Sequence, residues 1–340
     1  MPRRSGTAPT LATVADEAGV SRQTVSNALN SPHLLRPETL LRVQRAIDTL
    51  GYSPNRAARN LRTRASHLIG LKIEPAAEGA ANALMDRFLH SLVESSEGAG
   101  YHVLLFSSDV EDDPVAGYDA LLRSTAVDAF VITDTYRGNP QAGWLNKCGA
   151  PFVAFGRPWA EPTATHPWVD VDGRAGVVLA VDHLVSRGHS RIAWVGWAKS
   201  AFIGEDRRNG WVDAMHSHGL PTSKLSARGD DTVDFGRRAA LALLESEKPT
   251  AIVCASDIVA MGVLHALFDC GLQPGRDIAV VGFDDSIAAQ VTPPGLTSVR
   301  QPLEQVAVEI VRLLGKRLSH KPIDERGCLL APTLTVRHTS

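Results

Sequence analysis

Residues 11–30, LATVADEAGVSRQTVSNALN, constrain the fold most strongly, because they predict two short helices joined by a tight turn. Gly19 predicts a left-handed stop after the first helix, because a residue without Cβ reaches positive φ without a clash. Ser21 is placed to cap the second helix. Apolar or small side chains recur at helical spacing in both segments, at Leu11, Val14, Ala15, Ala18, Val25, Ala28 and Leu29.

The second helix is expected to turn a short polar face outward. Its members are Arg22, Gln23, Ser26 and Asn27, and none of them is acidic. These side chains can hydrogen-bond base edges and phosphates, so the pattern favours a helix that enters a DNA major groove. An ordinary helical hairpin with a solvated face is the alternative that this stretch alone leaves open.

A third helix is predicted over residues 37–50, opened by Pro37 and closed by Gly51. Its expected buried stripe consists of Leu40, Val43, Ile47 and Leu50.

Residues 1–66 contain ten arginines, no lysine and four acidic residues, which gives a formal charge of +6. Since the whole chain carries −2, the remainder carries −8. A basic head on an acidic body indicates a polyanionic partner at one end only.

The motifs V-A-x-x-A-G-V-S-x-x-T-V-S-x-x-L-N from Val14, G-Y-x-P-N-x-x-A-R-x-L from Gly51 and the strand HLIGLKI from His67 resemble the lactose-repressor (LacI/GalR) family. The resemblance covers almost the whole chain and implies a DNA-binding headpiece over residues 9–66, with a helix-turn-helix at 11–30. It also implies a hinge helix at 54–62, which folds when two copies meet on DNA and inserts Leu61 into the minor groove. The DNA contacts that the resemblance implies are Ser21, Arg22, Gln23, Thr24, Ser26, Asn27, Asn55, Arg56, Arg59 and Leu61.

After residue 66 short apolar runs alternate with helical segments, which predicts an α/β fold of parallel sheets with right-handed crossovers. The runs lie at 67–73, 101–107, 129–133, 151–156, 191–197, 251–256 and 278–283. Their number and spacing predict two doubly wound lobes with a cleft between them. The family implies a periplasmic-binding-protein-like sensor over 67–340 whose chain crosses near residues 166, 298 and 327. The expected lobes are about 67–166 plus 299–326, and about 167–298 plus 327–340.

Ligands of open α/β sheets bind beyond the carboxyl ends of the strands, where this chain gathers aromatic and charged residues. Such side chains suit a sugar, because C–H faces stack on indole while charged groups bind hydroxyls. The candidate ligand-binding residues are Glu74, Arg157, Trp159, Trp197, Asp206, Arg207, Ser256, Asp257 and Asp284.

Structural roles compete with ligand binding at several of these positions. Ser256, Asp257 and Asp284 are also placed to cap helices, and Trp197 continues an apolar run. Arg207 and its neighbour Arg208 cannot face the same way on one helix. The resemblance places Arg207 and Asp284 on ligand positions of the family, whereas Ser256, Gly156 and Asp231 depart from residues common there.

The sequence favours a homodimeric, cytoplasmic repressor that releases a pseudo-palindromic operator when a sugar binds, most similar to oligosaccharide-responsive (cellobiose-type) members. A ligand-requiring regulator of the same family and a sugar-binding protein without a DNA role are the alternatives. A dimer is expected because no heptad repeat follows the last strand-like segment.

Neither a disulfide nor a metal site is expected, because the four cysteines are scattered and the histidines lack metal-ligand spacing. No apolar run reaches membrane-spanning length, and neither enzyme activity nor a cofactor is expected.

Overall fold

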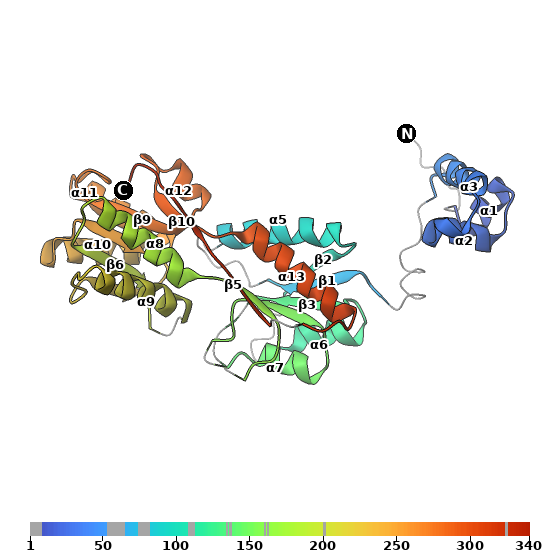
Figure 1. Ribbon diagram of the computed structural model, residues 1–340, viewed down its shortest axis with the longest axis horizontal. Coiled ribbons are helices and arrows are strands. Elements are labelled where there is room, and N and C mark those ends of the chain that lie inside the picture. The colour runs from blue at the N-terminus through green and yellow to red at the C-terminus, as the bar shows by residue number, and fades with distance from the viewer. Residues whose placement is uncertain are drawn as a thin grey trace. The chain divides into compact units, whose positions relative to one another are not determined.

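A computed structural model describes residues 9–52, 65–73, 82–107, 113–133, 135, 138–159, 161, 163–199, 202–323 and 326–340 (Figure 1). The chain divides into two compact units, Met1–Ala65 and Ser66–Ser340. The hinge residues Asn55, Arg56, Arg59 and Leu61 and the ligand candidate Glu74 lie outside the described residues. Within the described part, no helix is both long and apolar enough to cross a membrane.

The first unit contains α1 (Leu11–Ala18), α2 (Arg22–Asn30), the short 3₁₀ helix η1 (Pro32–Leu34) and α3 (Pro37–Leu50). The local stop and cap signals of the sequence are present: Gly19 has φ 60° and Gly51 has φ 61°. The Ser21 hydroxyl accepts a hydrogen bond from the Thr24 backbone N–H at 3.1 Å, satisfying a donor of the first turn of α2.

The core of this unit differs in detail from the expected stripes. Val14, Val25 and Val43 are fully buried at the meeting point of the three helices, as their spacing predicted. Leu11 is instead exposed at the start of α1, and Ala46 rather than Leu40 is buried on α3. A residue at a helix end lacks neighbours on one side, so helical spacing assigns its face but not its burial.

The first lobe of the second unit is a parallel six-stranded sheet in the order β11-β5-β4-β3-β1-β2. Helices α5 (Asn82–Gly98) and α13 (Leu303–Leu318) lie side by side on one face (Figure 1). Helices α6 (Ala116–Arg123) and α7 (Pro140–Lys147) pack on the other face. The strands are β1 (Leu68–Lys72), β2 (His102–Phe106), β3 (Ala129–Ile132), β4 (Phe152–Phe155), β5 (Trp168–Val171) and β11 (Gly327–Leu330).

The second lobe repeats this plan in the order β12-β10-β9-β8-β6-β7, with β12 antiparallel at the edge. Its helices pair as α8 with α9 and as α10 with α11 (Figure 1). Its strands are β6 (Ile192–Trp197), β7 (Ser226–Gly229), β8 (Ala251–Cys254), β9 (Ala279–Asp284), β10 (Thr297–Arg300) and β12 (Thr333–Thr335). Its helices are α8 (Gly173–Ser186), α9 (Phe202–Ser217), α10 (Val233–Ser246), α11 (Asp257–Asp269) and α12 (Ile287–Val291).

Backbone contact between α10 and α11 depends on glycine. A Cβ at Gly262 would lie 2.1 Å from the carbonyl oxygen of Val233, and a Cβ at Gly236 would lie 2.2 Å from that of Val259. The two helices therefore pack backbone against backbone on one face of the second sheet.

The chain crosses between the lobes three times, a few residues later than the positions near 166, 298 and 327 expected from the family. Strand β5 pairs with β4 and β11 in the first sheet, so the first crossing follows Val171. The second follows Arg300 at the end of β10, and the third lies between Leu330 and Thr333. Pro302 and Pro332 stand at the last two crossings, where a residue without an N–H cannot continue a strand ladder.

Candidate functional site

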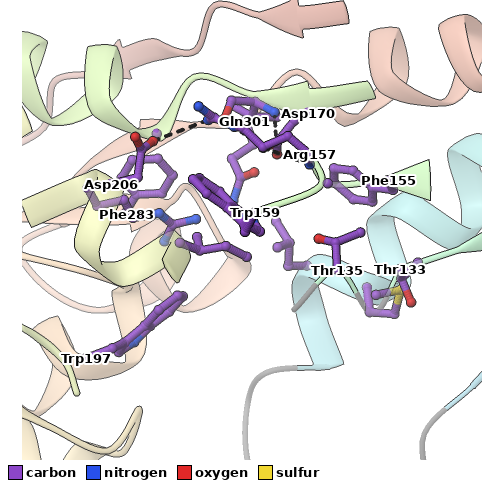
Figure 2. A pocket seen from close by; sticks show the side chains of 17 residues that line it. Thr133, Thr135, Phe155, Arg157, Trp159, Asp170, Trp197, Asp206, Phe283 and Gln301 are labelled. Carbon is purple, nitrogen blue, oxygen red and sulfur yellow. Dashed lines mark hydrogen bonds and ion pairs between the residues drawn. The ribbon is translucent and has the colours of Figure 1, made fainter. Parts of the chain in front are cut away.

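A pocket of about 200 Å³ lies where the two lobes face each other, beyond the carboxyl ends of the strands (Figure 2). Five of the candidate ligand residues line it, namely Arg157, Trp159, Trp197, Asp206 and Arg207. The other lining residues are Leu84, Met85, Thr133, Thr135, Phe155, Gly156, Asp170, Val171, Gly173, Ile203, Phe283 and Gln301.

Arg207 is the most deeply buried charge of the pocket, with a relative exposure of 5% on α9. Its guanidinium carbon lies 3.7 Å from the ring centroid of Phe283 and 4.9 Å from that of Trp197. Its Nη1 donates a hydrogen bond to the carbonyl oxygen of Ala255 at 2.6 Å. The same Nη1 lies 3.8 Å from Asp284 Oδ1. Burial lowers the pKa of Arg207, and the surrounding carboxylates, led by Asp284, raise it. Its Nε is buried and has no hydrogen-bond partner among the residues that the structure describes.

Arg157 connects the two lobes across the pocket. It follows β4 in the first lobe, and its Nε donates to Asp170 Oδ2 on β5 at 2.7 Å. Its Nη2 donates to Asp206 Oδ2 on α9 of the second lobe at 3.2 Å (Figure 2). Burial raises the pKa of Asp206, an effect that the Arg157 charge opposes. These three charges form an ion-pair network that is mostly shielded from solvent, since their side chains are 12–21% exposed.

Trp159 and Trp197 supply the flat apolar walls. The guanidinium of Arg157 lies 4.4 Å from the Trp159 ring centroid, and the ring of Phe202 stacks near the same indole with centroids 6.4 Å apart. The indole N–H groups of both tryptophans are buried, and no described residue pairs with them. With the Nε of Arg207, three of the residues that line the pocket each carry a buried donor without a partner among the described residues. Buried donors are usually paired, so such a group calls for an explanation such as a bound ligand or water.

The remaining described candidates lie behind the pocket wall. Ser256 caps α11, accepting from the Val259 N–H at 3.2 Å, so its capping role is present. Asp257 accepts from the Ser298 hydroxyl at 2.6 Å and from the Ser286 N–H at 2.7 Å, and burial raises its pKa. These two residues join β10, α11 and the loop after β9 rather than face the cavity.

Asp284 occupies an intermediate place, in contact with Arg207 but outside the lining of the cavity. Its Oδ1 accepts from the Gln301 amide at 2.7 Å, and burial raises its pKa while Arg207 lowers it. Its φ of 112° is rare for a residue with a side chain, a strain that surrounding structure must hold in place.

Sequence reasoning missed Asp170 and Gln301. Asp170 belongs to the apolar strand β5, but its position near the carboxyl end and its charge were available signals. Gln301 lies at a crossing between the lobes, and the position of that crossing depends on long-range strand pairing.

Gly156, at the end of β4, has φ 114°, and a Cβ there would lie 2.1 Å from the Thr135 hydroxyl oxygen. Glycine is therefore required in this backbone conformation.

In the first unit, the polar candidates cluster at the start of α2. Ser21, Arg22 and Gln23 are exposed, whereas Thr24, Ser26 and Asn27 are half-buried. The Gln23 amide donates to Asn27 Oδ1 at 3.0 Å, so these two side chains form one hydrogen-bonded pair on the helix surface.

Comparison with known proteins matches both units. The model of bacterial regulatory proteins of the lacI family matches residues 10–55, and that of the periplasmic binding protein-like domain matches residues 181–340. The HTH-type transcriptional regulator CelR of Thermobifida fusca is 33% identical over 339 residues, covering 97% of this chain and 98% of that protein. Catabolite control protein A of Priestia megaterium is 30% identical, covering 93% and 94%.

Solved structures also resemble the chain over almost its whole length. The complex of the transcriptional regulator CelR with cellobiose has a TM-score of 0.72 and 30% identity, covering 98% of this chain and all of that one. The lac repressor dimer bound to operator and the anti-inducer ONPF has a TM-score of 0.78 and 26% identity, covering 98% and 99%. With relatives of this identity over almost its full length, the chain belongs to the lacI family of bacterial transcription regulators.

Proposed function

We propose that this chain binds a pseudo-palindromic operator as a homodimer and releases it when a sugar or oligosaccharide occupies the pocket between its lobes. The observation that carries the effector class is a set of three buried donors, on Trp159, Trp197 and Arg207, that have no partner in the described part of the chain. They lie beside aromatic plates and carboxylates. Sugar hydroxyls accept from such donors and donate to carboxylates, while the C–H faces of a sugar ring stack on indole.

Cellobiose is the first candidate effector. The regulator in the solved CelR complex binds cellobiose, and that protein resembles this chain along its whole length. The two indoles, one from each lobe, suit a ligand with more than one stacking face. Maltose, lactose and single hexoses are the natural comparators, because they test ring number and linkage separately.

The proposed DNA contacts are Ser21, Arg22, Gln23, Thr24, Ser26 and Asn27 on α2 and, outside the described residues, Asn55, Arg56, Arg59 and Leu61. The exposed start of α2 supports the first group, because a recognition helix contacts base edges with its N-terminal residues. Leu61→Ala is expected to weaken operator binding at unchanged sugar affinity. Action on DNA implies a cytoplasmic location.

Regulation rather than catalysis is the proposed role of the pocket. Hydrolysis of a glycosidic bond needs a carboxylic acid and a second carboxylate free to act on opposite sides of that bond. Here Asp170 and Asp206 both accept from Arg157. Incubation with cellobiose is therefore expected to leave the disaccharide intact, as chromatography of the sugar would show.

The deciding experiment measures operator binding by fluorescence anisotropy while cellobiose and the comparator sugars are titrated. Operator release at a saturable sugar concentration is expected, together with a raised melting temperature of the free protein. Tighter DNA binding with sugar would identify a ligand-requiring regulator instead. Operator binding that no sugar alters would contradict the proposal, and sedimentation of a monomer with operator would contradict the dimer.

A further inference from the structure

The charges around the pocket are paired with one another. Arg157 uses Nε for Asp170 at 2.7 Å and Nη2 for Asp206 at 3.2 Å and for the carbonyl oxygen of Val171 at 3.3 Å. A guanidinium recognises a carboxylate or phosphate through parallel N–H donors of this kind. Two protein carboxylates already occupy that geometry.

Arg207, the second cation of the pocket lining, is also compensated. Asp284 lies 3.8 Å from its Nη1, and Asp231, Asp170 and Asp206 act on it electrostatically as well. Among the described residues, its buried Nε has no hydrogen-bond partner. A single N–H suits one hydroxyl oxygen, whereas binding a ligand anion here would add a further negative charge beside several protein carboxylates.

Those carboxylates already repel one another. Burial raises the pKa of Asp206, and the charges of Asp172 and Asp170 raise it further against the opposing effect of Arg157. In a site with little solvent, another anion costs desolvation and repulsion together. Arg157 could meet a ligand anion by turning away from Asp170 and Asp206, but this would leave two buried carboxylates without their cation.

We propose that the pocket selects an uncharged saccharide and rejects acidic or phosphorylated ones, with Asp170 and Asp206 as the specificity-determining residues. This inference rests on the proposed function, that the pocket binds a sugar. The two aspartates hold the guanidinium of Arg157 in an ion-pair network, so the described cations that a ligand meets are already paired with protein carboxylates. The donors without partners then bind neutral hydroxyls.

Isothermal titration with matched neutral and anionic ligands tests the selection on the parent protein. The pairs are cellobiose with cellobiouronic acid, in which a carboxylate replaces one hydroxymethyl group, and glucose with glucose 6-phosphate. The neutral member of whichever pair binds is expected to bind at least about tenfold more tightly. Equal or tighter binding of the anionic member would overturn the inference and leave the proposed function intact. If no saccharide of either charge binds, the proposed function itself fails.

Asp206→Asn tests the assignment to a residue, since it removes one negative charge and retains the shape of the side chain. The ratio of neutral to anionic affinity is expected to fall by about tenfold, because Arg157 gains capacity to pair with the ligand anion. Asp213→Asn is the matched control. It lies on the same helix and pairs with Arg174 at the surface, and it is expected to leave the ratio unchanged. An unchanged ratio in Asp206→Asn, with both variants folded, would overturn the role of Asp206.

Discussion

Removing the Arg207 guanidinium is expected to destabilise the sensor in a pH-dependent way and to abolish the sugar response. At 3.8 Å the Arg207–Asp284 pair has a Coulomb energy of about 4 kcal/mol at an effective dielectric constant near 20. The desolvation of both charges offsets much of this energy in the intact pair. Removing one partner alone typically costs roughly 3–5 kcal/mol, since it leaves a buried charge uncompensated.

Protonation of Asp284 limits that cost at low pH. Burial raises the pKa of the Asp284 carboxyl, and Arg207 opposes the rise, so the pKa is expected to increase further in Arg207→Ala. The folded variant then binds a proton that the unfolded chain releases, and its stability falls as pH rises from the ordinary carboxyl range toward that raised pKa. Near pH 5.5 the remaining cost is about 1–2 kcal/mol, from the lost hydrogen bond to the Ala255 carbonyl oxygen.

Urea unfolding of the parent, Arg207→Ala, Asp284→Asn and the double variant, at pH 5.5 and pH 8, measures these free energies. The loss in Arg207→Ala should be larger at pH 8 by at least about 1 kcal/mol. Adding Asp284→Asn should recover stability at pH 8, because it removes the unpaired charge. Operator affinity should persist in Arg207→Ala while cellobiose no longer changes it. A pH-independent loss of stability, or operator release by cellobiose at ordinary concentrations, would refute the reasoning.

Three further substitutions test separate parts of the molecule. Arg22→Ala should relax preference at one base pair per half-site by roughly 1–3 kcal/mol, measured by selection from randomised operators; an unchanged preference contradicts a base-reading role. Trp159→Ala should weaken sugar binding by at least about fivefold in titration calorimetry at unchanged operator affinity, since stacking contributes roughly 1 kcal/mol or more. Gly262→Ala should lower the free energy of unfolding, measured in urea, by about 2 kcal/mol or more, because its Cβ would lie 2.1 Å from a carbonyl oxygen. Gly143→Ala on α7, where a Cβ would meet open space, is the control and should leave the free energy of unfolding unchanged or raise it.

Local signals explain what the sequence predicted well. Gly19, Ser21 and Gly51 lie at helix ends because their own backbone and side-chain chemistry favours those places, with little help from the rest of the chain. The same holds for the strands whose apolar runs are continuous. Arg157, Trp159 and Trp197, which line the pocket, follow from strand ends, because parallel strands bring their carboxyl ends to one edge in any doubly wound sheet. Asp206 and Arg207 lie on α9 and came from the segment after Trp197, Arg207 by the family resemblance.

Long-range pairing explains the rest. The first crossing follows Val171 because β5 pairs with a strand more than 150 residues away, which no local pattern encodes. Asp257 is at a strand end, as a ligand residue would be, yet Ser298 on another strand draws its carboxylate inward. Asp170 lies on an otherwise apolar strand, and its role depends on the approach of Arg157. In each case a partner remote in sequence decides what the side chain does.

Asp284 shows how the pocket and the crossing segments are joined. Its carboxylate lies beside Arg207 and accepts from Gln301, which stands at the crossing after β10. Its carbonyl oxygen accepts from Arg87 Nη1 at 3.2 Å, on α5 of the first lobe. A ligand that binds Arg207 more favourably in one arrangement of the lobes than in another shifts the balance between them by that difference in affinity. The contacts of Asp284 thus join the residues of the pocket, the crossing after β10 and both lobes, although Asp284 does not line the cavity.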